Sequence, residues 1–281
     1  MDYDTVIVRY AEIFLKSDYV RRSFSNRLAD NLRDALRRQG IDGKVVLGHH
    51  RLFIKAGQGE KAAQTTSNVF GVKSASPAVR ASPDFDRLTE SAMAFAGERV
   101  RDGSFAVKAK RSKDYPLDSR QMECKLGAAI VGRYGNRVDL DNPETLISVE
   151  AYADRAYLFS ETFPGVGGLP YGTQGKVACQ ADDRLQALAA WMMMRRGCKI
   201  VLAGGASDYA AALAGYCSPQ PTAYPTLAQA LEDGEVKGIV SAQTLKDIDL
   251  ESEKKQGLPV FRPLIGLDES QIGSLLARAG L

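Results

Sequence analysis

The chain has 281 residues, of which 44% are hydrophobic and 25% are charged. This composition is typical of a soluble globular protein, and the length allows two or three domains with a sizeable core. No apolar run approaches the roughly 20 residues that a membrane-spanning helix needs, and the first residues lack the basic and apolar regions of a signal peptide. We therefore expect a cytoplasmic protein that does not associate with a membrane.

Cysteine and histidine are scarce and poorly placed for a metal. The cysteines lie far apart, with no C-x-x-C pair, at Cys124, Cys179, Cys198 and Cys217. This spacing argues against a zinc site and a disulfide framework, and it favours buried structural thiols. His49 and His50 are adjacent in a predicted hairpin turn, where alternating side chains cannot easily bind one ion. We predict no metal site.

The net charge of +3 is unevenly distributed. Nine Lys or Arg face four Asp or Glu between Arg101 and Arg137, and eight face four between Arg9 and Arg38. From Asp139 to Glu161 the balance reverses, with six acids against one base. Two basic regions and an acidic one favour a surface for a polyanion, although solvated helix faces would give the same counts.

The first 75 or so residues predict a small α+β domain. A β-branched strand at 6–10 precedes a helix at 24–36, whose apolar residues recur at helical spacing and which Gly40 ends. An apparent hairpin at 45–54 and a second helix at 62–71 follow. This β-α-β-β-α order favours a ferredoxin-like domain.

The next region predicts a second α/β domain. A helix at 84–100 and an alternating strand at 104–110 precede a helix that starts with Asp118 or Ser119 as its N-cap. Three short strands are then expected at 138–140, 147–151 and 156–159, the last two as a hairpin.

The segment from Gly165 to Lys176 holds five glycines and one internal proline in twelve residues. Such a segment cannot be the interior of a helix or strand, so it marks a domain junction. A strand at 177–180, an apolar-striped helix ended by Gly197 and a strand at 198–203 follow, which predicts a β-α-β unit in a parallel sheet. The consecutive methionines of that helix continue its apolar stripe and predict core packing rather than a metal site. Further strands at 238–241 and 258–262 and a closing helix at 269–279 are expected.

Several spaced segments resemble the tRNA 4-thiouridine synthetase (tRNA sulfurtransferase) family. They are Val8-Arg-Tyr-Ala-Glu-Ile13, Val69-Phe-Gly-Val72, Phe105 to Arg111, Tyr115-Pro-Leu-Asp-Ser119, Val138-Asp-Leu-Asp-Asn-Pro143, the glycine-rich segment, Ser241-Ala-Gln-Thr-Leu245 and Val260-Phe-Arg-Pro-Leu-Ile-Gly266. The resemblance implies a multidomain protein of the α/β and α+β classes. Its expected parts are a ferredoxin-like domain (1–76), an RNA-binding THUMP domain (77–164), a hinge (165–176) and a reduced Rossmann-like, parallel-sheet domain of the ATP-pyrophosphatase (PP-loop) type (177–281).

The resemblance fails at the phosphate loop. Active members carry Ser-Gly-Gly-x-Asp-Ser there, whose glycines let backbone N–H groups approach the phosphates of ATP. Counting back from Ala189-Ala-Trp191, which matches the family, the loop positions hold Ala181, Asp182, Asp183, Arg184, Leu185 and Gln186. Two aspartates would repel a triphosphate, by about 1 kcal/mol for each charge pair at ~4 Å in water. A metal bridging both acids to phosphate would rescue the site, whereas a plain helix N-terminus also favours acids.

The length of this region points the same way. Only 43 residues lie between Gly197 and Ser241, whereas the resemblance implies further strand–helix units here in active relatives. We therefore expect a degenerate, shortened copy of the domain, with no catalytic residue and no cofactor.

We thus predict a tRNA-binding protein that acts in tRNA modification, namely the thiolation that forms 4-thiouridine, more as an inactive homologue than as an enzyme. The candidate phosphate contacts are Lys108, Lys110, Arg111, Lys113, Arg120 and Lys125. Their role would be positional, with little base readout, and each one alone also fits a solvated surface residue.

Two alternatives remain open. The chain could be an active tRNA sulfurtransferase with a diverged ATP loop, which would need ATP and Mg²⁺, or a metabolic enzyme that reuses the fold. The predicted partner is tRNA, and a catalytic protein partner and a homodimer also remain open.

Overall fold

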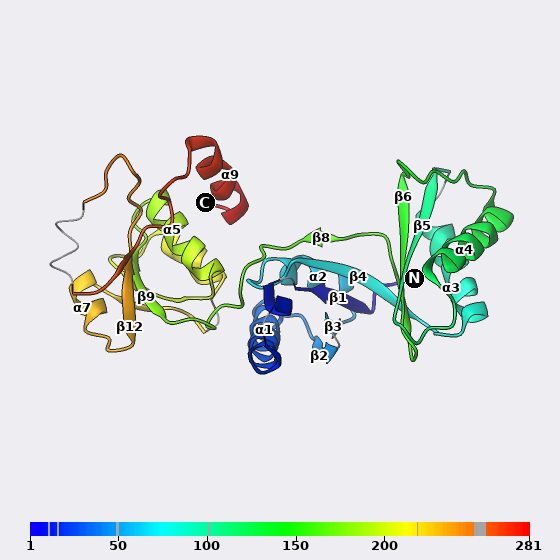
Figure 1. The fold of residues 1–281 in the computed structure, drawn as a ribbon, viewed down its shortest axis with the longest axis horizontal. Coiled ribbons are helices and arrows are strands. Elements are labelled where there is room, and N and C mark those ends of the chain that lie inside the picture. The colour runs from blue at the N-terminus through cyan, green and yellow to red at the C-terminus, as the bar shows by residue number, and fades with distance from the viewer. Residues whose placement is uncertain (11, 16, 49–50, 101, 218, 250–256) are drawn as a thin grey trace. The chain divides into compact units, whose positions relative to one another are not determined.

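The computed structural model describes residues 1–10, 12–15, 17–48, 51–100, 102–217, 219–249 and 257–281 (Figure 1). The predicted turn at His49 and His50 lies outside these residues, as does Arg101. Contacts divide the chain into two compact units. The first unit comprises Met1–Val8, Gln39–Thr65 and Ser74–Pro164, and the second comprises Arg9–Arg38, Thr66–Lys73 and Gly165–Leu281.

The first unit is built on a sheet with the strand order β2-β3-β1-β4-β7-β6-β5, and β8 pairs with β4 outside this path. Its strands are β1 (Thr5–Arg9), β2 (Lys44–Gly48), β3 (Arg51–Lys55), β4 (Ser74–Ala81), β5 (Phe105–Arg111), β6 (Thr145–Ala151), β7 (Ala156–Phe159) and β8 (Phe163–Pro164). Strand β4 has 8 residues, and its last three pair antiparallel with β7. One strand therefore links the ferredoxin-like part to the THUMP part.

Two helices, α3 (Phe85–Arg99) and α4 (Ser119–Tyr134), pack with β5, β6 and β7 around one core. Phe95, Phe105 and Leu126 are fully buried in it. Asp118 is the N-cap of α4 and completes a capping box with Gln121, which settles the predicted choice between Asp118 and Ser119. The strand expected at 138–140 is reduced to one isolated bridge, between Phe105 and Val138, because this segment folds into a turn held by its own side chains.

A buried ion pair joins the two parts of the first unit. Arg51 Nε of β3 lies 2.8 Å from Glu150 Oε2 of β6, and the Glu150 side chain is only 3% exposed. The Tyr152 hydroxyl donates to Glu150 Oε2 (3.0 Å) and accepts from Arg51 Nε (3.1 Å). Burial, followed by the charge of Glu150, raises the pKa of Tyr152 to about 12, so the phenol stays protonated and keeps its bond to the carboxylate.

The second unit holds a sheet of order β11-β10-β9-β12-β13, parallel throughout as the β-α-β pattern predicts. Its strands are β9 (Lys176–Gln180), β10 (Lys199–Ala203), β11 (Thr222–Tyr224), β12 (Val236–Val240) and β13 (Val260–Phe261). The helices described in this unit are η1 (Glu12–Leu15), α1 (Asp18–Arg38), α5 (Arg184–Arg195), α6 (Asp208–Gly215), α7 (Leu227–Leu231) and α9 (Glu269–Ala279). Helix α2 (Gly59–Ser67) lies mostly in the first unit. The strand order reverses at β9, which lies between β10 and β12.

The core of the second unit centres on Trp191 of α5, which is fully buried. The ring of Phe70 lies 5.6 Å from Trp191 and 5.2 Å from Tyr216. Met193 and Met194 are buried and Met192 packs against the same core, so the methionine run serves packing as predicted.

Three of the cysteines are buried as expected, but Cys124 is exposed on α4, which corrects the prediction for that residue. Burial raises the pKa of the Cys179 thiol to about 12 and that of Cys217 to about 11, so neither is a thiolate at neutral pH. Within the described residues no group of three or more His, Cys, Asp or Glu could hold a metal ion. No helix among the described residues is long and apolar enough to cross a membrane.

Candidate RNA-binding surface and nucleotide site

All six predicted phosphate contacts are exposed and lie on three consecutive segments, β5, the turn after it and α4. We call them the β5–α4 cations; they are Lys108, Lys110, Arg111, Lys113, Arg120 and Lys125. Lys108 and Lys110 lie on the same face of β5, because alternate residues of a strand share a face. None of the six forms an ion pair with another described residue, so their charge remains available for a ligand.

The turn between β5 and α4 is held by Arg111. Its Nη1 donates to the backbone oxygens of Lys113 (2.8 Å), Ser112 (3.1 Å) and Tyr115 (3.5 Å). Tyr115 is buried and its hydroxyl donates to the oxygen of Pro83 at 2.8 Å. Arg111 therefore shapes the loop that presents Lys113, and only its remaining N–H groups are free for phosphate.

Helix α4 is fixed to the edge strand that carries the lysines. Glu123 Oε1 accepts a hydrogen bond from the backbone N–H of Ala109 at 2.8 Å, which satisfies a donor on the open edge of β5. The ammonium of Lys125 lies 5.6 Å from the centre of the Phe85 ring, a cation–π contact. These contacts set the spacing between the cations of the strand and those of the helix.

The second basic region, on α1, is partly neutralised within the helix, because three aspartates face its six arginines. Four arginines of α1 pair with aspartates that lie three or four residues earlier in the chain. In the last three of the pairs named below, the nitrogen and oxygen atoms are 2.7 to 3.3 Å apart. The pairs are Arg21–Asp18, Arg33–Asp30, Arg37–Asp34 and Arg38–Asp34. The β5–α4 cations are therefore the stronger of the two predicted polyanion surfaces.

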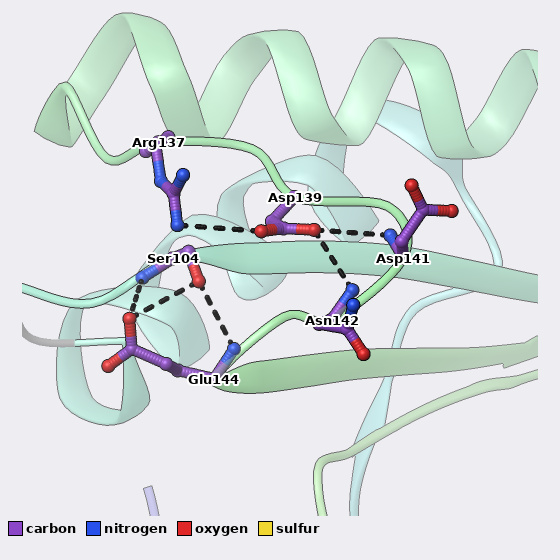
Figure 2. Close-up of polar contacts among 6 residues, drawn as sticks. All are labelled: Ser104, Arg137, Asp139, Asp141, Asn142 and Glu144. Atoms are coloured by element: carbon purple, nitrogen blue, oxygen red, sulfur yellow. Dashed lines mark hydrogen bonds and ion pairs between the residues drawn. The ribbon is translucent and has the colours of Figure 1, made fainter.

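The acidic segment after α4 is occupied by local hydrogen bonds (Figure 2). Asp139 Oδ1 accepts from the backbone N–H groups of Asn142 (2.9 Å) and Asp141 (3.2 Å), while Arg137 Nη2 lies 3.4 Å from Oδ2. The bond from Asn142 is the main cause that lowers the pKa of Asp139. The Asp139 carboxylate therefore has a structural part in this turn, and it stays charged.

The end of the same loop is tied to the start of β5. Glu144 Oε1 accepts from the backbone N–H of Ser104 (3.1 Å) and from its hydroxyl (3.3 Å), as Figure 2 shows. In return Ser104 Oγ accepts from the backbone N–H of Glu144 at 3.2 Å. This reciprocal arrangement fixes the parallel start of β5 and β6.

In the second unit a hollow of about 380 Å³ opens at the carboxyl ends of β9 and β12. Ligands of open α/β sheets bind at such a point, where the strand order reverses. Its polar lining comes from Gln180, Asp183, Gln186, Ser241, Gln243, Asp247 and Arg262. The sequence pattern gave no role to the last four, although each ends or follows a predicted strand, and such ends meet at one edge of a parallel sheet.

The carboxylate of Asp183 occupies the N-terminus of α5. Asp183 is the N-cap, and its Oδ1 accepts from the backbone N–H groups of Leu185 (2.8 Å) and Gln186 (2.9 Å). The backbone N–H of Asp182 donates to Gln186 Oε1 at 2.9 Å. These are the donors that a bound anion would otherwise use at a helix N-terminus. Side chains of this protein therefore accept the hydrogen bonds of these N–H groups.

Three family models match the chain: the ThiI ferredoxin-like domain at residues 5–76, the THUMP domain at 82–161 and the thiamine biosynthesis protein (ThiI) at 220–280. They define a protein with the ferredoxin-like, THUMP and parallel-sheet parts that the sequence predicts, so the predicted fold class is confirmed. The last match begins after the predicted phosphate loop at residues 181–186.

Among curated proteins, the probable tRNA sulfurtransferase of Methanocaldococcus jannaschii is 31% identical, over 98% of this chain and 87% of that protein. The one from Aeropyrum pernix is 32% identical, over 100% of this chain and 84% of that protein. The chain therefore belongs to the tRNA sulfurtransferase family, as the resemblance predicts.

Solved structures agree. PH1313 from Pyrococcus horikoshii Ot3 superposes with a TM-score of 0.88 at 30% identity, covering 99% of this chain and 100% of that one. The structure of a 4-thiouridine synthetase–RNA complex with bound ATP has a TM-score of 0.80 at 22% identity, covering 99% of this chain and 85% of that one. The latter match shows a shared fold.

Proposed function

We propose that this chain is a tRNA-binding member of the tRNA sulfurtransferase family that takes part in tRNA thiolation without an ATP site of its own. The observation that carries the proposal is the Asp183 carboxylate, which accepts the first free N–H groups of α5. In this proposal the chain needs neither ATP nor Mg²⁺, and a protein partner supplies the catalysis.

Binding ATP would require two unfavourable changes. The Asp183 side chain would have to leave the helix N-terminus, and losing an N-cap costs about 1 kcal/mol. Its charge and that of Asp182 would then repel the triphosphate, by about 1 kcal/mol per pair at ~4 Å in water and several times more at lower dielectric. Without glycine at these positions, the backbone also lacks the freedom to wrap phosphate closely.

The length of the chain supports the same proposal. The alignment with the M. jannaschii relative extends over 334 positions, whereas this chain has 281 residues in total. That relative therefore contains residues with no counterpart here. The segment between Gly197 and Ser241 is short for a full pyrophosphatase domain, and we propose that the missing residues belong to it.

The RNA-binding half of the proposal rests on the β5–α4 cations. They lie in the THUMP match, are exposed and form no ion pair with described residues. Lysine and arginine at such positions contact phosphates and orient the RNA without reading its sequence. The structurally similar synthetase was solved with RNA, which makes tRNA the favoured partner over a metabolite.

Calorimetry with ATP and Mg²⁺, in the presence and absence of tRNA, tests the proposal. We expect no binding heat and no AMP formation. Micromolar ATP affinity, or AMP released with tRNA present, would identify an active sulfurtransferase with a diverged loop. Failure of the parent protein to bind any RNA would instead favour a metabolic enzyme.

A deletion strain tests the cellular role. Mass spectrometry of its tRNA thionucleosides should show less 4-thiouridine than the parent strain. Unchanged thionucleosides would exclude a role in thiolation.

A further inference from the structure

Two arginines from different helices hold the glycine-rich segment of the second unit. Arg195, the last residue of α5, donates from Nε to the oxygen of Val166 at 3.0 Å. Arg278 of α9 donates from Nη2 to the oxygens of Gly165 and Val166, both at 3.1 Å. Neighbouring carbonyls thus hold two guanidinium groups at the start of the hinge.

The two guanidinium groups converge beside Gly167. A Cβ added to this glycine would lie 3.6 Å from Arg195 Nη2 and 3.8 Å from Arg278 Nη2, with no other non-neighbouring atom within 4 Å. Gly167 is partly exposed and Arg278 is exposed, so solvent and solutes reach this point. The structure therefore contains an accessible space bordered by two positive charges.

Neither arginine forms an ion pair with another described residue. The carboxylate of Glu12 attracts Arg195, but less strongly than the charge of Arg278 repels it. Burial, followed by the nearby charge of Arg278, lowers the pKa of Arg195. Two like charges held together without a counterion are unfavourable in the free protein, and a bound anion would relieve them.

Further cations extend the site along the hinge. A Cβ at Gly172 would lie 3.1 Å from Lys199 Cε and 3.8 Å from Arg27 Nε. Arg196 is exposed at the end of α5. We call this set the hinge cations; they are Arg27, Arg195, Arg196, Lys199 and Arg278. Lys176 is left out of the set, because Asp233 and Glu235 form ion pairs with it; Glu235 also attracts Lys199, but forms no ion pair with it.

We propose that the hinge cations bind phosphate groups of an RNA backbone, with Arg195 and Arg278 holding one phosphate beside Gly167. Paired guanidinium groups suit this ligand, because the N–H groups that do not donate to the hinge carbonyls match phosphate oxygens; these are on Nη1 and Nη2 of Arg195 and on Nε and Nη1 of Arg278. The inference rests on the proposed tRNA binding and gives the second unit a direct part in it. The site is separate from the β5–α4 cations, which belong to the first unit.

A matched pair of substitutions at Gly167 tests the site. Its φ of +70° lies in the left-handed region, which Asn and Asp tolerate better than other side chains. Gly167→Asp places a carboxylate between the two guanidinium groups, whereas Gly167→Asn has the same shape without the charge. We expect Gly167→Asp to unfold at a higher temperature than Gly167→Asn, because its carboxylate replaces the missing anion.

RNA binding is measured by fluorescence polarisation with an unmodified tRNA transcript across a series of salt concentrations. Gly167→Asp should bind several-fold more weakly than Gly167→Asn, with a salt slope lower by about one. Arg278→Gln should show the same loss. Lys246→Gln is the control, because it removes a cation of the same unit that lies outside the hinge cations. The Lys246 side chain is 88% exposed, and this variant should bind tRNA as the parent does.

The outcomes separate the possible failures. Equal tRNA affinity and equal salt slopes for Gly167→Asp and Gly167→Asn would overturn the hinge site, as would a lower unfolding temperature for Gly167→Asp. A third outcome is that tripolyphosphate binds at the hinge of the parent while Gly167→Asp loses no tRNA binding. The hinge would then bind free phosphate, and the RNA assignment would be overturned. A parent protein that binds no tRNA would refute the proposed function itself.

Discussion

Replacing Asp183 by alanine should destabilise the second unit by about 1 kcal/mol. The carboxylate accepts hydrogen bonds from two N–H groups of α5, at 2.8 and 2.9 Å, and alanine leaves both without a protein partner. Loss of an N-cap side chain costs about 0.5–2 kcal/mol. The free energy of unfolding of a small domain falls by about 1–3 kcal/mol for each molar of urea, so a loss of about 1 kcal/mol should lower the urea concentration at the unfolding midpoint by roughly 0.3–1 M.

The single tryptophan makes this measurement specific. Trp191 lies on α5 and is fully buried, so its fluorescence in urea reports the unfolding of the unit that contains the substitution. Asp182→Ala is the matched control, because it removes a neighbouring carboxylate that makes no hydrogen bond to a described residue. Asp183→Asn and Asp183→Ser should restore most of the stability, since both side chains can cap a helix.

Equal stability across the series would contradict this prediction. If Asp183→Ala and Asp182→Ala unfold at the same urea concentration as the parent, the Asp183 carboxylate does not hold the N-terminus of α5. Asp183 would then not keep an anion from that helix end, whatever the ATP measurements show.

Two further predictions concern the first unit. Changing Lys108, Lys110 and Arg111 together to alanine should weaken tRNA binding and lower the salt slope by about two to three, because each cation neutralises a phosphate; a polarisation titration that matches the parent would remove these residues from the site. Arg51→Ala should cost about 3–5 kcal/mol in a denaturation experiment, because it removes the guanidinium that lies 2.8 Å from the buried Glu150 carboxylate. A loss below about 1 kcal/mol would mean that Glu150 finds water or another donor.

Local features of the fold could be read directly from the sequence. Asp118 predicts the start of α4, and Gly197 predicts the end of α5, because capping and left-handed glycine depend on a few neighbouring residues. The β-α-β order after the hinge likewise predicts parallel strands, since a crossover helix permits little else. Asp182 and Asp183, which stand where the resemblance places the phosphate-loop glycines, were visible at the same level.

Longer-range arrangements depended on tertiary packing. The chain from Arg9 to Arg38 belongs by its contacts to the second unit, although it directly follows the first strand of the ferredoxin-like part. An amphipathic helix shows which of its faces is apolar but not which distant surface will cover that face. For this reason the pattern predicts α1 but not the unit that it completes.

Residue identity and neighbours along the chain were enough to predict the family and the elements that short-range signals mark, such as α4, α5 and the parallel strands β9 and β10. Which charges are available could be known only from the fold. It pairs four arginines of α1 with aspartates, leaves the β5–α4 cations without ion pairs among the described residues, and brings Arg195 and Arg278 to one glycine from separate helices. Charge pairing depends on distances of a few ångströms between side chains, and the fold sets those distances.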